Sequence, residues 1–145
     1  MERWPAYPEG VAENRFRELI RIRLMREKVL SKDAESDLLK DAVTKLGLSL
    51  DKARGLLVSE TDNSSIDLES DIDDATSGIL ASLANDKKKI SYRDFEIASR
   101  FHARKTRKNM EDARREVKRI MEVNLYEPKA AGILRTRRWY RRIKV

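Results

Sequence analysis

The chain has 145 residues, of which 40% are hydrophobic and 39% are charged, and its formal net charge is +7. Disordered chains have a lower hydrophobic fraction than this. The composition therefore suits one folded domain with a modest core. The sequence holds no cysteine, which excludes disulfides, thiolate metal sites and cysteine nucleophiles. No apolar run approaches the roughly 20 residues of a membrane span, and the first residues lack a signal-peptide pattern, so we expect a cytoplasmic protein.

The predicted regular elements are all helices, and they lie between residues 11 and 126. Residues 1–10 form an extended entry because they carry Pro5 and Pro8, with Trp4 and Tyr7 expected to pack on the body. Beyond them, apolar residues recur at helical spacing, Ser31, Ser49 and Ser91 stand at N-cap positions, and Gly47 stands at a helix end. The sequence therefore predicts an all-α fold, a single compact bundle of about five helices, at roughly 11–30, 32–46, 50–60, 66–84 and 92–126. The helical domain would span 11–127, with a basic aromatic tail over 128–145.

The fifth predicted helix is long if it is continuous, because neither proline nor glycine occurs between Ser91 and Pro128, and the alternative is a break near residues 106–109. Its second half repeats apolar residues at alternating spacings of three and four, namely Met110, Ala113, Val117 and Ile120. This seam is shorter than the three or four heptads typical of a coiled coil. We expect it to pack on the first helix of the same chain, with a homodimer through residues 110–124 as the alternative.

Candidate contact residues gather in the tail, which ends GILRTRRWYRRIKV. From residue 128 to 145 there are seven basic residues and no acid, whereas the remaining chain holds 25 basic and 25 acidic residues. Arginine pairs with phosphate and carboxylate, and aromatic rings stack on bases. The expected partner or phosphate contacts in the tail are Arg135, Arg137, Arg138, Trp139, Tyr140, Arg141 and Arg142.

Two further charged groups lie in the body of the chain. The basic group could also contact phosphate or a partner, and the acidic group could form a docking surface. Because the helices that carry them are predicted to be antiparallel neighbours, an internal electrostatic seam between the two groups is an alternative. The basic group is Arg104, Lys105, Arg107 and Lys108, and the acidic group is Asp62, Asp67, Glu69, Asp71, Asp73 and Asp74.

No catalytic, cofactor or metal site is predicted. An EF-hand loop starting at Asp67 would need glycine at its sixth position and glutamate at its twelfth, where this chain has Ile72 and Gly78. His102 is the one histidine, so it cannot build a common zinc site, and we expect it to be half-buried and structural. The turn at Gly47 is similar to a DNA-binding helix-turn-helix, but the helix after it lacks asparagine and glutamine, which favours a packed corner.

One stretch, VLSKDAESDLLKDAVTKLGLSLDKARGLL at residues 29–57, resembles the TerB-type helical domain of tellurite-resistance proteins. A fainter echo, KISYRDFEIA, lies at residues 89–98. The resemblance implies an all-helical fold built of two related halves. The family usually carries an acidic Asp-Gly turn before this stretch, and its clustered acids are associated with metal ions. Here that place reads Arg26-Glu27-Lys28, so we do not expect metal binding to transfer.

These observations favour a non-enzymatic, TerB-like helical interaction or adaptor module that docks protein partners through charged helix faces and its basic tail. The first alternative is nucleic-acid binding through the tail. The second is association with an anionic membrane surface, since Ile133, Thr136, Tyr140 and Ile143 would share one face if the tail were helical. We expect the tail to be a strap docked on its own domain or on a partner. A free basic arm is the less favoured alternative.

Overall fold

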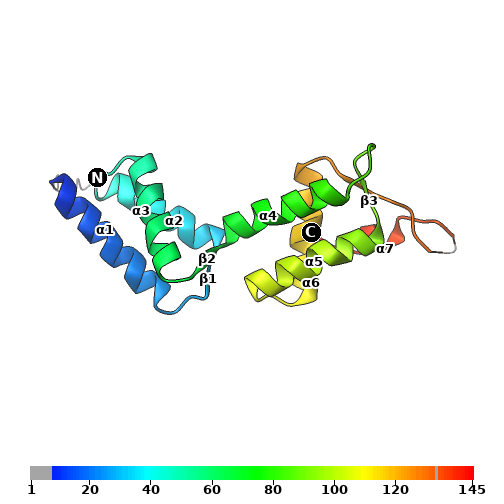
Figure 1. The fold of residues 1–145 in the computed structure, drawn as a ribbon, viewed down its shortest axis with the longest axis horizontal. Coiled ribbons are helices and arrows are strands. Elements are labelled where there is room, and N and C mark those ends of the chain that lie inside the picture. The colour runs from blue at the N-terminus through cyan, green and yellow to red at the C-terminus, as the bar shows by residue number, and fades with distance from the viewer. Residues whose placement is uncertain (1–7, 133) are drawn as a thin grey trace. The chain divides into compact units, whose positions relative to one another are not determined.

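A computed structural model describes residues 8–132 and 134–145 (Figure 1). The predicted all-α class is confirmed, because the described residues form seven helices joined by turns and two-residue strands. The predicted packing of Trp4 and Tyr7 lies outside the described residues. The helices are α1 (Glu9–Leu24), α2 (Lys32–Thr44), α3 (Leu50–Asn63), α4 (Glu69–Leu83), α5 (Tyr92–Thr106), α6 (Met110–Val123) and α7 (Arg138–Arg141).

Four short strands pair in parallel, which the sequence did not predict. Strand β1 (Val29–Leu30) pairs with β2 (Asp67–Leu68), and β3 (Lys89–Ile90) pairs with β4 (Glu127–Pro128). Pairings of two residues are too short to leave an alternating pattern. They explain why the predicted helices over 11–30 and 66–84 are each shorter in the structure: residues 29–30 and 67–68 leave the helical path to pair with each other.

The residue contacts divide the chain into two compact units, Met1–Ser70 and Asp71–Val145. The first unit holds 12 basic and 14 acidic residues, and the second holds 20 basic and 11 acidic residues. The division therefore separates a nearly neutral unit from a strongly basic one. Residues 128–145, which the sequence predicts as a tail, belong to the second unit.

Helix ends follow the predicted capping residues. The hydroxyl oxygens of Ser31, Ser49 and Ser91 each accept a backbone N–H from three residues further on, at 3.2, 3.2 and 3.1 Å. Gly47 follows α2 with a φ of 71°, a left-handed conformation that glycine adopts without strain. Ser31 and Ser91 each come directly after a pairing strand, so the sequence echo between 29–57 and 89–98 marks equivalent strand-to-helix turns.

Each unit has its own apolar core. In the first unit, Phe16, Ile20, Leu30 and Leu57 are fully buried between α1, α2 and α3. In the second unit, Leu80, Phe95 and Val117 belong to one cluster that joins α4, α5 and α6. The predicted apolar stripes therefore identify most of both cores.

The fifth predicted helix, over 92–126, is two helices, because the chain breaks between α5 and α6, where the sequence left its continuity open. Arg107 has a φ of 59°, in the left-handed region, which ends α5. Asn109 then caps α6, and its side-chain oxygen accepts the N–H of Asp112 at 2.8 Å. Asparagine is among the strongest N-cap residues, so this break has a local cause in the sequence.

The break folds α6 back against α5. The apolar seam of α6 is thereby buried within its own unit: Ala113, Val117 and Ile120 all belong to the buried core. The seam packs within its own chain as predicted, but the predicted neighbour, the first helix, is wrong, because α6 packs against α5. Because these side chains are buried in the core of their own unit, they offer little apolar surface to a second copy.

Candidate partner-binding surfaces

The C-terminal segment is docked on the second unit by its aromatic side chains. The ring of Trp139 lies 5.1 Å from that of Phe95 and 5.3 Å from that of Tyr92, between centroids. Its indole N–H donates to the backbone carbonyl of Lys129 at 3.0 Å. A buried tryptophan usually satisfies its N–H in this way. The tail is therefore a strap held on its own unit.

A lysine of α6 fixes the end of this strap. Lys118 Nζ donates to the backbone carbonyls of Tyr140 at 3.1 Å and Ile143 at 2.7 Å. The same ammonium group lies 4.5 Å from the centroid of the Tyr140 ring, within cation–π range. Burial, with a smaller contribution from Glu122, raises the pKa of Tyr140 to about 12. The phenol is thus a neutral, packed group at ordinary pH.

The arginines of the strap, unlike its aromatic side chains, lie mostly on the surface. Arg135, Arg138, Arg141 and Arg142 are exposed, and Arg137 is half-buried. No ion pair formed among the described residues involves any of these side chains. Packing thus sorts the tail into an inward aromatic side and an outward cationic side. We call Arg135, Arg138, Arg141 and Arg142 the arginine face.

A cleft of about 260 Å³ lies where the strap meets α6. Arg114 in this cleft donates two hydrogen bonds to Glu96, at 2.8 and 3.0 Å, which raise the pKa of the guanidinium group further. Arg115 pairs with acids of its own helix. The cations left for an external anion are Arg142 and Lys144. The full lining is Glu111, Arg114, Arg115, Arg142, Ile143 and Lys144.

The second predicted basic group lies at the end of α5. Arg104 and Lys105 are exposed in its last turn, where the helix dipole favours cations. Arg107 is exposed at the left-handed residue that ends the helix, and Lys108 is half-buried. The helix dipole therefore accounts in part for the basic residues at this helix end.

The predicted acidic group is divided between the units, since Asp62, Asp67 and Glu69 belong to the first and the later three acids to the second. Glu69 lies 3.9 Å from Lys32 of α2. Asp73 is bonded to His102, with 2.9 Å between its Oδ1 and Nε2. The remaining members, Asp62, Asp67, Asp71 and Asp74, are exposed. Within either unit the group therefore supplies only part of the predicted docking surface.

His102 is buried more deeply than predicted, with 0% of its surface exposed. Besides its bond to Asp73, its Nδ1 atom and the Oγ atom of Ser99 are buried without a hydrogen-bond partner among the described residues. The geometry therefore gives His102 a packing role within the second unit.

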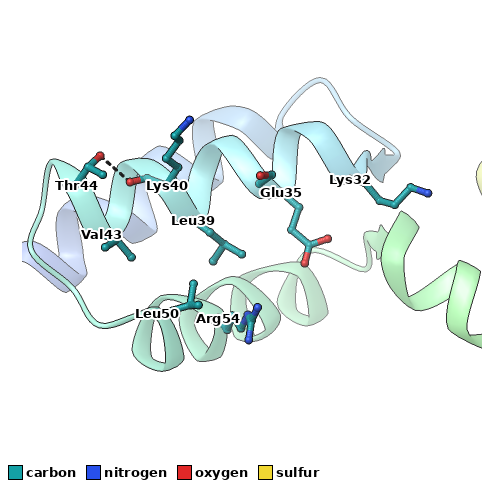
Figure 2. Close-up of a pocket in the computed structure, with 9 residues that line it drawn as sticks. Lys32, Glu35, Leu39, Lys40, Val43, Thr44, Leu50 and Arg54 are labelled. Atoms are coloured by element: carbon teal, nitrogen blue, oxygen red, sulfur yellow. Dashed lines mark hydrogen bonds between the residues drawn. The ribbon is translucent and has the colours of Figure 1, made fainter.

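A groove of about 510 Å³ between α2 and α3 in the first unit was not predicted. Figure 2 shows Leu39 and Val43 of α2 directed toward α3, with Leu50 of α3 facing them. Val43 is 41% exposed and Leu50 is 43% exposed. Charges of both signs line this groove, and its carboxylate, Glu35, accepts the hydroxyl of Ser70 at 2.8 Å. Its two exposed apolar residues stand at the edges of their helical stripes, a position the sequence pattern cannot distinguish from the core.

Comparison with known proteins adds no name to these surfaces. No family model, curated protein or solved structure matches the chain. The resemblance to the TerB-type domain stays a prediction. Within residues 8–132 and 134–145, no group of three or more histidine and acidic side chains is placed to hold a metal ion. No helix in that part of the chain is both long and apolar enough to cross a membrane.

Proposed function

We propose that the chain is a non-enzymatic interaction or adaptor module that docks an acidic surface of a partner protein on its arginine face. One observation carries the proposal. The strap turns Trp139 and Tyr140 inward and leaves Arg135, Arg138, Arg141 and Arg142 exposed, with no ion pair among the described residues.

Charge balance supports an anionic partner. The second unit holds 20 basic against 11 acidic residues, and several of these acids, such as Glu96 and Asp73, already have partners. Neighbouring guanidinium groups repel one another, and an opposing carboxylate surface removes this repulsion. Anchoring by Trp139 and Lys118 also fixes the backbone beneath the arginines, so less conformational freedom is lost on binding.

Nucleic acid is the second candidate, because arginine also binds phosphate with two parallel hydrogen bonds. Stacking on unpaired bases, however, needs free aromatic faces. Trp139 is packed against Tyr92 and Phe95, so its ring is not free to stack on a base. The form of nucleic-acid binding that the geometry favours is contact with duplex phosphates.

The membrane alternative relied on an amphipathic helix through the tail. Helix α7 spans only Arg138–Arg141, and Tyr140 and Ile143 pack against the core of the second unit. Ile133 lies outside the described residues. The apolar side chains that would enter a membrane are therefore largely used inside the protein.

The test compares the intact chain with the variant R135Q/R138Q/R141Q/R142Q. A matched control replaces by glutamine four exposed basic residues of the first unit that form no ion pair with any other described residue: Arg15, Arg23, Arg26 and Lys28. Binding to fluorescent polyglutamate, a short DNA duplex and anionic vesicles is measured by anisotropy or sedimentation from low to high salt. Truncation at Glu127 is a poorer test, because it also removes Trp139 from the core.

The expected result is polyglutamate binding that weakens about tenfold in the arginine-face variant and little in the control. Tighter binding of the duplex, with the same dependence on the arginine face, would favour the second candidate. Preference for vesicles would favour the membrane alternative. Equal binding by the variant and the control would overturn the assignment of the arginine face.

A further inference from the structure

The second unit has another surface, a groove between α4 and α5, which the arginine face does not include. We propose that this groove seats an acidic amphipathic helix of a partner protein. The volume of the groove is about 410 Å³. We call it the α4–α5 groove, lined by Ile79, Ser82, Leu83, Ile97, Arg100, Phe101 and Arg104.

Apolar side chains form the floor of this groove. Ile97 is 40% exposed, and Ile79, Leu83 and Phe101 are half-buried. A second hollow of about 410 Å³ adjoins it along α5 and shares Ile97 with it. Tyr92, at the far end of that hollow, is 47% exposed. The two hollows therefore form one strip along α5, in which Tyr92 and Ile97 are the exposed apolar side chains.

The charges beside this strip select an acidic occupant. Arg100 and Arg104 are exposed one helical turn apart, where like charges repel. Neither belongs to an ion pair within the described part of the chain. The one acid in the adjoining hollow, Glu96, is buried and held by both hydrogen bonds from Arg114. The free charge at the groove is therefore positive.

The apolar floor distinguishes protein from nucleic acid. A phosphate backbone would satisfy Arg100 and Arg104 and would leave Ile97 and Phe101 facing a charged, hydrated strand. An amphipathic helix presents an apolar stripe flanked by carboxylates, which matches both features at once. The α4–α5 groove thus calls for a protein partner.

The walls of the groove favour a helix over an extended peptide. Both walls are helices, whose inner backbone groups already bond within their own helix. An extended segment would bury its own amides without backbone partners there, whereas a helix satisfies its amides internally. From Tyr92 to Arg104 the helix α5 rises ~18 Å, which is the length of about 12 helical residues.

The test uses a designed helical peptide of about 14 residues, with a leucine stripe flanked by glutamates on an alanine background. Two matched peptides replace the glutamates by lysines or scatter the leucines around the helix. Binding to the full chain is followed by fluorescence anisotropy and by ¹⁵N chemical-shift mapping. We expect the acidic peptide to bind at least about tenfold more tightly than either control, with shifts centred on Ile79, Ile97 and Phe101.

Charge reversal gives the sharper test. The double variant R100E/R104E should weaken binding of the acidic peptide about tenfold and should strengthen binding of its lysine counterpart. Ile97→Asn should weaken both. The arginine-face variant R135Q/R138Q/R141Q/R142Q should retain tight binding, which separates this proposal from the proposed function. A matched reversal in the first unit, K40E/R54E, should also have little effect.

Three outcomes would overturn the proposal. The first is no saturable binding of the acidic peptide up to about 1 mM. The second is shifts that map to the arginine face or to the α2–α3 groove. The third is self-association of the chain that R100E/R104E abolishes, because the groove would then be filled by a second copy.

Discussion

The ring of Trp139 lies 5.1 Å from that of Phe95, centroid to centroid, at an interplanar angle of 54°. Phe95 is fully buried in the second unit, so this contact joins the C-terminal strap to the unit's core. The strap is therefore part of the folded second unit.

Replacing Trp139 by alanine should destabilise the second unit by about 2–3 kcal/mol, since the change removes ring contacts with Phe95 and Tyr92. Trp139→Phe keeps part of the packing and should cost less. Urea unfolding followed by circular dichroism measures both. A loss under about 0.5 kcal/mol for the alanine variant would mean that the strap contributes little to stability.

Replacing Lys118 by methionine should loosen the end of the strap, because the carbonyls of Tyr140 and Ile143 lose their donor. Hydrogen exchange of the backbone amides around residues 140–143 should become about tenfold faster. Arg119→Met is the matched control, since Arg119 is the next residue and pairs with Glu116 of its own helix. Unchanged protection in Lys118→Met would contradict the role given to Lys118.

Replacing Asn109 by alanine should lower the free energy of unfolding by about 1 kcal/mol, because α6 loses its N-cap. A continuous helix through this position predicts the opposite sign, since alanine has the higher helix propensity. Asn109→Ser retains a capping oxygen and should be nearly neutral. Chemical denaturation of the three proteins therefore decides between a broken and a continuous helix.

The raised pKa of Tyr140 makes stability depend on alkaline pH. The folded state holds the phenol protonated up to about pH 12, whereas an unfolded tyrosine ionises near pH 10. The stabilising contribution is complete below pH 10 and is lost as pH rises from 10 to about 12. Tyr140→Phe should lose less stability than the parent across this interval, as measured by denaturation at each pH. An equal loss in both proteins would show that the phenol is not protected.

Local signals in the sequence predicted the helices and much of the core. The Ser31, Ser49 and Ser91 caps depend on hydrogen bonds three residues away, so a short window contains the whole cause. Gly47 ends α2 for an equally local reason. The break at Asn109 is also locally encoded, but the same segment holds good helix formers, so the sequence left the continuity of the helix open there.

Features made by distant residues could not be read in this way. The bond between Asp73 and His102 joins residues 29 positions apart, and Lys118 meets the carbonyl of Ile143 across 25 positions. The charge and the aromatic residues of the tail predicted that it docks as a strap. Which side chains turn inward depends on their partners in α5 and α6, namely Tyr92 and Phe95 for Trp139 and Lys118 for Tyr140.

We propose that the strap binds its partner with arginines while its aromatic rings stay packed. The most direct measurement uses the variant Trp4→Phe, in which Trp139 is the single tryptophan, and records its emission and acrylamide quenching during titration. Saturation with polyglutamate should leave both nearly unchanged, and adding single-stranded DNA should not quench the indole. Strong quenching by single-stranded DNA would mean that Trp139 leaves Phe95 to stack on bases, which would contradict the account.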